Sequence, residues 1–360
     1  MRPETEAELV DVILGAAGPL LVRGGGTRTI GRALGEVLET GGLSGVELYE
    51  PGALTLVVRA GTPLAEVEAV LAGDRQRLAF EPPDLRGLLG REGASTIGGV
   101  VAANASGPRR VQVGACRDAL LGVRFVDGAG NVVKNGGRVM KNVTGYDLVK
   151  LMAGSQGTLG VLSEVSFKVQ ALPEAEATLV VEGLDDVAGL AVLRKALGSP
   201  FDISGAAREG GRSLIRVEGM AGSVTYRVGQ LRALLAADVT VVEGAESADL
   251  WRRVRDVEAF AGRKGDVWRL AVVPTAAADV VAAEAGEAVW DWGGGLVWLL
   301  VAEGRAEAVR DAVAGRGHAT LIRGEGTPVF PPEAAEVAAL AGGLRDRFDP
   351  RNILNRGMMG

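Results

Sequence analysis

The segment Val22-Arg23-Gly24-Gly25-Gly26-Thr27-Arg28-Thr29-Ile30-Gly31 places three consecutive glycines directly after a short predicted strand, Leu20–Arg23. Consecutive glycines can turn their backbone N–H groups inward into a nest that holds a diphosphate, and side chains at those positions would block the approach. The segment fits neither G-x-G-x-x-G nor G-x-x-x-x-G-K-[ST], because no ribose-binding acid follows at the Rossmann spacing and the P-loop lysine is missing. Taken alone, it fits a diphosphate loop and an ordinary flexible turn equally well.

A second glycine-rich stretch follows Phe80-Glu81-Pro82-Pro83-Asp84. It reads Gly93-Ala94-Ser95-Thr96-Ile97-Gly98-Gly99-Val100-Val101-Ala102-Ala103-Asn104-Ala105-Ser106-Gly107. Small residues from Gly98 to Gly107 would let the start of a helix lie against a flat, bulky ligand, and free N–H groups at such a start favour phosphate. A tight alanine and glycine contact between two helices is the alternative interpretation.

A third stretch concentrates polar side chains without helical or strand periodicity. It reads Val139-Met140-Lys141-Asn142-Val143-Thr144-Gly145-Tyr146-Asp147-Leu148, and Gly154-Ser155-Gln156-Gly157-Thr158-Leu159-Gly160-Val161-Leu162-Ser163-Glu164 follows shortly after. Such a pattern is a poor core element and indicates a site loop, with a solvated loop as the alternative.

Composition excludes several classes of function. The net charge of −6 gives no basic face for nucleic acid. The chain has one cysteine, Cys116, and one histidine, His318, which excludes an internal disulfide and a cysteine-ligated zinc or iron–sulfur site within one chain. We therefore expect no metal. With neither a signal peptide nor an apolar run of about 18 residues, we expect a cytoplasmic protein, with membrane attachment through a partner left open.

Strand and helix patterns predict an α+β chain that changes character near residue 172. Before it, the expected strands are Leu20–Arg23, Val46–Tyr49, Thr55–Arg59, Leu120–Val126, Asn131–Val133 and Gly160–Val169, and the helices are Glu4–Ala17 and Pro63–Leu71. After it, the expected strands are Thr178–Val181, Leu214–Glu218, Val239–Glu243, Val267–Val273 and Leu296–Val301. The helices there are Asp185–Leu197, Ser223–Ala236, Ser247–Phe260, Ala276–Ala288, Arg305–Ala314 and Pro332–Phe348. The five tryptophans, all in this second half, are expected to pack its core, with a partner surface as the alternative.

The three glycine-rich and polar segments, in this order, resemble the FAD-binding domain of the vanillyl-alcohol-oxidase (PCMH-type) flavoproteins. Within that superfamily the chain is most similar to the FAD-binding subunits of glycolate oxidase, the GlcE type. This resemblance is carried by Ala105-Ser106-Gly107-Pro108-Arg109-Arg110, by Arg117-Asp118, by Val139–Leu148 and by the tail from Asp349-Pro350 to Asn355. It implies a PCMH-type FAD-binding domain of two subdomains over 1–172, a ferredoxin-like α+β cap over 173–330, and a C-terminal helix and tail over 331–360 that return to the FAD domain.

The resemblance also implies roles for individual residues. The pyrophosphate of FAD would be held by main-chain amides of Gly24, Gly25, Gly26, Thr27 and Arg28. The flavin would be lined by Pro82, Pro83, Gly98, Gly99, Asn104 and Ser106. Backbone groups of Gly160 and Val161 would meet the adenosine half.

Two departures from the superfamily pattern refine the prediction. Many members attach FAD through a histidine beside the pyrophosphate loop; this loop has none, so we expect non-covalent FAD and interpret Cys116 as a small buried cysteine rather than a second attachment point. Hydroxy-acid dehydrogenases of the superfamily use a C-terminal histidine cluster for metal binding and proton abstraction. Only His318 is present here, and a surface or capping role is the favoured interpretation.

The resemblance therefore implies a division of labour. A sister flavoprotein subunit would oxidise glycolate or another small 2-hydroxy acid, an iron–sulfur subunit would receive electrons, and the flavin of this chain would relay electrons or play a structural part. The alternative is a stand-alone FAD oxidoreductase acting on another alcohol or hydroxy acid, with Lys141, Tyr146 or Asp147 as acid–base groups. A binding subunit whose FAD never turns over is the third possibility.

Overall fold

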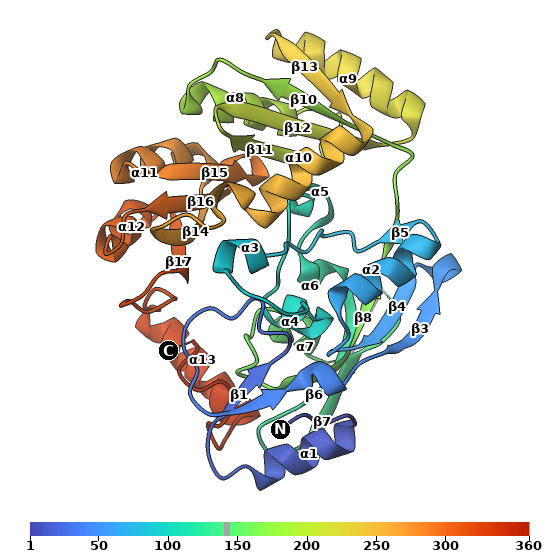
Figure 1. Cartoon of the computed structure of the whole chain (residues 1–360), viewed down its shortest axis with the longest axis vertical. Coiled ribbons are helices and arrows are strands. Elements are labelled where there is room, and N and C mark those ends of the chain that lie inside the picture. The colour runs from blue at the N-terminus through green and yellow to red at the C-terminus, as the bar shows by residue number, and fades with distance from the viewer. Residues whose placement is uncertain (140–144, 360) are drawn as a thin grey trace.

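In a computed structural model, which describes residues 1–139 and 145–359, the first half of the chain folds around a five-stranded antiparallel sheet of order β3-β4-β8-β6-β7 (Figure 1). The strands are β3 (Val46–Glu50), β4 (Thr55–Arg59), β6 (Leu120–Val126), β7 (Val132–Gly136) and β8 (Val161–Lys168). Its helices are α2 (Leu64–Gly73), α3 (Arg86–Leu89), α4 (Ile97–Ala102), α5 (Arg110–Val113), α6 (Cys116–Ala119) and α7 (Leu148–Met152). Apolar side chains of the central strands, such as Val58, Phe125 and Phe167, are fully buried against these helices and form the first core.

The N-terminal segment and the C-terminal tail lie side by side. Helix α1 (Glu6–Gly15) begins after Thr5, whose side chain accepts a hydrogen bond from the N–H of Glu8, and it buries Leu9 and Ile13. Strand β1 (Leu20–Arg23) pairs in parallel with β2 (Glu36–Glu39). On its other side Leu20 pairs with Leu354, so the tail after α13 (Ala335–Phe348) returns to the glycine-rich loop.

A short ribbon of β5 (Gln76–Arg77) and β9 (Gln170–Ala171) precedes the second half, whose antiparallel sheet has eight strands in the order β13-β10-β12-β11-β15-β16-β14-β17. The strands are β10 (Ala175–Val181), β11 (Gly205–Glu209), β12 (Arg212–Gly219), β13 (Val239–Glu243), β14 (Asp266–Val272), β15 (Glu287–Asp291), β16 (Leu296–Val301) and β17 (Gly317–Arg323). This order is that of two ferredoxin-like βαββαβ units joined edge to edge through β11 and β15.

Helices cover both faces of the large sheet (Figure 1). One face packs against α8 (Asp186–Leu197), α9 (Ala221–Leu235), α11 (Ala277–Glu284) and α12 (Ala306–Val313). The other face contacts α10 (Gly244–Asp256) and, from the first half, Leu88 of α3. This second face is the one turned toward the first half, and four of the five tryptophans are buried in the two cores of this sheet while Trp292 is only partly buried.

The predicted α+β class is confirmed, but strands β2, β5, β9, β11 and β15 were not predicted. Strand β2 is short, and β11 contains glycine and alanine at buried positions, which gives no strand signal. The helix predicted over Ala276–Ala288 ends earlier, because Ala285 adopts a left-handed conformation with φ +49° and the chain then enters β15. Within the described residues, no helix is long and apolar enough to cross a membrane.

Candidate functional site

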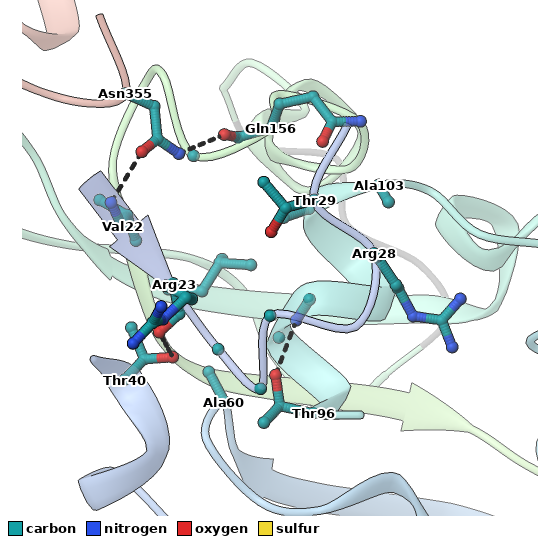
Figure 2. A pocket seen from close by; sticks show the side chains of 18 of the residues that line it. Val22, Arg23, Arg28, Thr29, Thr40, Ala60, Thr96, Ala103, Gln156 and Asn355 are labelled. Atoms are coloured by element: carbon teal, nitrogen blue, oxygen red, sulfur yellow. Dashed lines mark hydrogen bonds between the residues drawn. The ribbon is translucent and has the colours of Figure 1, made fainter. Parts of the chain in front are cut away.

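An open cleft lies beside the glycine-rich loop that connects β1 to β2 (Figure 2). Its walls come from that loop, from the start of α4, from the turn before β8 and from the C-terminal tail. The lining residues are Val22, Arg23, Gly24, Gly25, Gly26, Thr27, Arg28, Thr29, Thr40, Ala60, Thr96, Gly98, Gly99, Ala102, Ala103, Ser155, Gln156, Gly157, Gly160, Leu162, Asn355 and Met358. Segments distant in the sequence therefore meet at one cleft.

Glycine is required at the base of the loop for steric reasons. A Cβ at Gly24 would lie 2.2 Å from Oγ1 of Thr96, and one at Gly25 would lie 1.6 Å from the backbone oxygen of Ala94. A Cβ at Gly98 would lie 2.7 Å from the backbone oxygen of Ala60. The loop thus packs backbone to backbone against the segment before α4, which leaves its other side open to a ligand.

The same loop leaves hydrogen-bond donors without partners. The backbone N–H groups from Gly25 to Thr29 donate to no acceptor within the described ranges 1–139 and 145–359. Arg28 donates from Nε and Nη2 to Oγ of Ser95, at 3.2 and 3.1 Å, while its buried Nη1 has no partner there. Oγ of Ser155, across the cleft, is also buried and unpartnered in that part of the chain.

Burial of the Arg28 guanidinium lowers its pKa to about 10, despite the opposing attraction of Asp84 and Asp256. The side chain remains a cation near neutral pH, with incomplete hydrogen bonding in a poorly solvated position. Together with the free N–H groups, this arrangement favours an anionic, oxygen-rich group such as a diphosphate.

Asn355 fixes the position of the loop from the C-terminal tail. Its Oδ1 accepts a hydrogen bond of 2.7 Å from the N–H of Val22, and its Nδ2 donates at 2.7 Å to the backbone oxygen of Gln156 (Figure 2). A Cβ at Gly157 would lie 2.8 Å from that Nδ2. One side chain therefore ties together β1, the turn before β8 and the tail.

Eight residues that the sequence assigned to FAD line the cleft: Gly24, Gly25, Gly26, Thr27, Arg28, Gly98, Gly99 and Gly160. Five others do not line it, namely Pro82, Pro83, Asn104, Ser106 and Val161. Oδ1 of Asn104 accepts a hydrogen bond from the N–H of Arg117, and Oγ of Ser106 accepts one from the N–H of Cys116. These two side chains thus hold the start of α6, and Val161 is buried at the start of β8.

The candidate acid–base residues are not brought to the cleft where the structure describes them. Tyr146 is 89% exposed, and Asp147 accepts a hydrogen bond from the N–H of Lys150 at the start of α7. Lys141 lies outside the described residues. Sequence reasoning did not single out Thr29, Thr40, Ser155, Gln156, Asn355 or Met358 as lining residues.

Cys116 is fully buried, and this burial raises the pKa of its thiol. The burial and the raised pKa disfavour reactive thiolate chemistry at Cys116.

The residues that the structure describes contain no cluster of histidine, cysteine, aspartate and glutamate suited to a metal ion.

A buried charge network joins the two halves of the molecule. Glu81 accepts hydrogen bonds from Nη1 and Nη2 of Arg216 on β12, at 3.0 and 2.8 Å. Glu218 on β12 pairs with Arg109 and, at 2.7 Å, with Arg77, both from the first half. Glu218 also lies 3.6 Å from Nε of Arg216, so the five groups form one continuous network.

Comparison with known proteins gives a consistent set of relatives. Residues 1–136 match the family described as FAD binding domain. The glycolate oxidase subunit GlcE of Escherichia coli (strain K12) is 34% identical over 349 residues, covering 95% of this chain and 92% of that protein. The glycolate oxidase subunit GlcD of Bacillus subtilis (strain 168) is 30% identical over 185 residues, covering 47% of this chain and 36% of that protein.

Two further matches are more distant. The D-lactate dehydrogenase of Anaerostipes hadrus is 39% identical over 115 residues, which is 31% of this chain and 23% of that protein. A solved structure of alkyldihydroxyacetonephosphate synthase superimposes with a TM-score of 0.71 at 15% identity, covering 99% of this chain and 76% of that one. At this identity the structural match supports the fold alone.

Proposed function

This chain belongs to the family of the glycolate oxidase subunit GlcE, and we propose that it is the FAD-binding subunit of a complex that oxidises glycolate, or a closely related 2-hydroxy acid, to the 2-oxo acid. In this proposal the chain carries electrons from that oxidation toward an iron–sulfur partner. The resemblance inferred from the glycine-rich segments is confirmed by the relative that covers 95% of the chain.

The chain is an FAD-dependent oxidoreductase, and FAD is its cofactor, as predicted. The observation that carries the assignment to this cleft is the set of unpartnered donors, from the N–H groups of Gly25–Thr29 to Nη1 of Arg28. These donors suit the pyrophosphate, and Gly24 and Gly25 permit its close approach. Bound FAD supplies a two-electron acceptor for alcohol oxidation.

The residues of this chain account for the binding and orientation of the cofactor better than for removal of the hydroxyl proton of the substrate. The loop amides and Arg28 would hold the pyrophosphate, and Asn355 would keep the loop in register with the turn at Gln156. His318 is the chain's one histidine, and removal of a hydroxyl proton near neutral pH is most readily done by histidine. A sister flavoprotein subunit that supplies the missing base is therefore part of the proposal, and the relatives named as subunits GlcE and GlcD support it.

The test is purification of the chain with and without its expected partners, followed by flavin spectra before and after glycolate is added. We expect co-purification with a second flavoprotein and a cysteine-rich iron–sulfur protein, and bleaching of the flavin of this chain only in the assembled complex. Rapid reduction of the isolated chain by 2-hydroxy acids would contradict the division of labour and support a stand-alone oxidoreductase. A flavin that stays oxidised in the complex after both glycolate and dithionite would indicate a structural cofactor.

We expect FAD to be bound without a covalent link. The glycine-rich loop Val22–Gly31 contains no histidine to which the flavin could be attached, and Cys116 is buried with a raised pKa. Denaturation in acid should release all yellow colour into the supernatant, where it can be measured by absorbance. Yellow colour that stays on the precipitated polypeptide would contradict this prediction.

A further inference from the structure

Two arginines from different halves of the molecule contact one partly buried indole. The guanidinium carbon of Arg110, at the start of α5, lies 4.4 Å from the ring centroid of Trp292, and that of Arg269 on β14 lies 5.3 Å from it. Nε1 of Trp292 donates a hydrogen bond of 3.1 Å to the backbone oxygen of Gly107. The indole therefore bridges the sheet of the second half and the segment that leads from the cleft-lining helix α4.

Neither guanidinium has a counter-ion in the part of the chain that the structure describes. Among residues 1–139 and 145–359, the side chains of Arg110 and Arg269 make no hydrogen bond and no ion pair. The pKa of Arg269 is lowered to about 10 by burial and by the positive charge of Arg110. The pKa of Arg110 is lowered by burial and by Arg117, with Asp118 opposing, although that carboxylate already accepts a hydrogen bond from the N–H of Ala115.

Other arginines that contact aromatic rings in this chain do have acceptors. Arg216, over Trp251, pairs with Glu81, and Arg263, over Phe260, pairs with Glu287. Arg310, over Trp268, donates to the backbone oxygen of Pro328. Two cations that contact one ring without an acceptor repel each other, as the effect of Arg110 on the pKa of Arg269 indicates, and an anion bound by both would offset this repulsion.

Arg269 projects from the sheet face that is turned toward the first half. Directly paired residues share a face, so Arg269 stands with Trp298 of β16 and Thr320 of β17, and Ala271 stands with His318. Trp298, Val267, Val289 and Leu296 make this face largely apolar. A charged group without an acceptor on such a face, at the junction of two domains, is typical of a ligand site.

We propose that Arg110 and Arg269 bind the carboxylate of a small 2-hydroxy acid between the two halves of the chain. Stacked guanidinium groups keep their N–H edges available for the paired oxygens of a carboxylate. The apolar face around Trp298 suits a small planar carboxylate better than a more strongly hydrated, tetrahedral phosphate. This inference rests on the proposed function, which it extends by assigning substrate-binding residues to this subunit.

The test is titration of the FAD-loaded full chain with oxalate, an anion that cannot be oxidised as a 2-hydroxy acid, and with glycolate. Flavin absorbance and tryptophan fluorescence report binding. The variants Arg110→Met and Arg269→Met keep most of the apolar stem and remove the charge. Each should weaken oxalate binding by about tenfold to a hundredfold, the effect of losing one charge-assisted contact. Arg269→Lys, which keeps the charge but loses the planar fork, should fall between wild type and Arg269→Met.

The matched control is Arg263→Met, which removes an arginine that also stacks on an aromatic ring but is exposed and paired with Glu287. It should bind oxalate as wild type does. FAD content and thermal midpoint are measured for every variant, so a variant that fails to fold is recognised, and Arg269→Lys then carries the test. Unchanged oxalate affinity in a flavin-loaded Arg269 variant overturns the proposal, and so does inorganic phosphate binding as tightly as oxalate.

The experiments distinguish failure of the carboxylate site from failure of the proposed reaction. If oxalate binds through the two arginines but glycolate never reduces the flavin in the assembled complex, the carboxylate site stands and the proposed reaction fails. If glycolate reduces the flavin in the complex and both methionine variants bind oxalate normally, the reaction stands and the carboxylate site fails.

Discussion

Replacement of Gly25 by alanine is expected to yield a protein that has lost at least nine-tenths of its FAD, a tenfold or greater weakening of about 1.4 kcal/mol or more. The new Cβ would lie 1.6 Å from the backbone oxygen of Ala94, so the loop must move as a whole. Movement takes the N–H groups of Gly25–Thr29 away from one another, and each lost contact to a charged group costs about 1.5–3 kcal/mol. The measurement is the ratio of flavin to protein after gel filtration, together with the affinity for added FAD.

Two further variants make this prediction specific to the loop. Gly15→Ala is the matched control, because no atom lies within 4 Å of the added Cβ at the end of α1, and its flavin content should be normal. Gly24→Ala meets a side chain, Oγ1 of Thr96 at 2.2 Å, rather than backbone. Its defect should therefore be partly relieved by Thr96→Ala, whereas the defect of Gly25→Ala should not. Full flavin content in Gly25→Ala would contradict the assignment of the loop.

The sequence made the glycine loop recognisable because local chemistry determines it. A strand that runs into three glycines fits a flexible turn equally well when it is taken alone, and the two further segments with small or polar residues decided the interpretation. Asn355 could not be predicted in the same way. Its role depends on the tail lying beside β1, at a separation of 333 residues from Val22, and no local pattern encodes that contact.

The fold of the second half was also only partly predictable from local sequence. Alternating strands and helices predicted an α+β layer, which is confirmed, but β11 has the sequence Gly-Ala-Ala-Arg-Glu and lacks the β-branched residues that indicate strands. Gly205 is small because the ring of Trp251 packs against it, with a distance of 2.7 Å from an added Cβ to the nearest ring atom. Packing against Trp251 therefore requires a small residue in β11, and small residues give no strand signal in the sequence.

The charge clusters that join the two halves of the chain could not be predicted from the sequence either. Arg110 stands in a run that carried the family resemblance, yet nothing in the sequence connects it with Trp292 or Arg269. The buried network of Glu81, Arg216 and Glu218 also joins residues far apart in the chain. Residue type predicts that such groups need partners, but only the fold identifies them.

Replacement of Glu218 by glutamine is expected to destabilise the protein by about 3–5 kcal/mol near neutral pH, the usual cost of breaking a buried ion pair from one side. The change leaves Arg77, Arg109 and Arg216 around a neutral amide, and the side chain of Glu218 is only 3% exposed. The measurement is the urea midpoint of the FAD-loaded protein. Glu287→Gln is the matched control, because that carboxylate pairs with Arg263 at the surface, where exposed pairs contribute about 0–1 kcal/mol.

The dependence of protein stability on acidic pH distinguishes the contribution of the charge of Glu218 from that of its packing. Burial alone would raise its pKa, but Arg216, Arg109 and Arg77 outweigh burial and lower it to about 2. A carboxylate whose pKa is lower in the folded protein stabilises the folded state at pH values above its pKa in the unfolded chain, which is about 4.3. This contribution to the free energy of unfolding is lost as the pH falls toward about 2. The wild-type protein should therefore lose on the order of 3 kcal/mol over this range that Glu218→Gln does not lose, since a tenfold change in proton affinity corresponds to about 1.4 kcal/mol. Parallel pH profiles for the two proteins would mean that the three arginines do not stabilise the charge of Glu218, and the network would then contribute through shape rather than electrostatics.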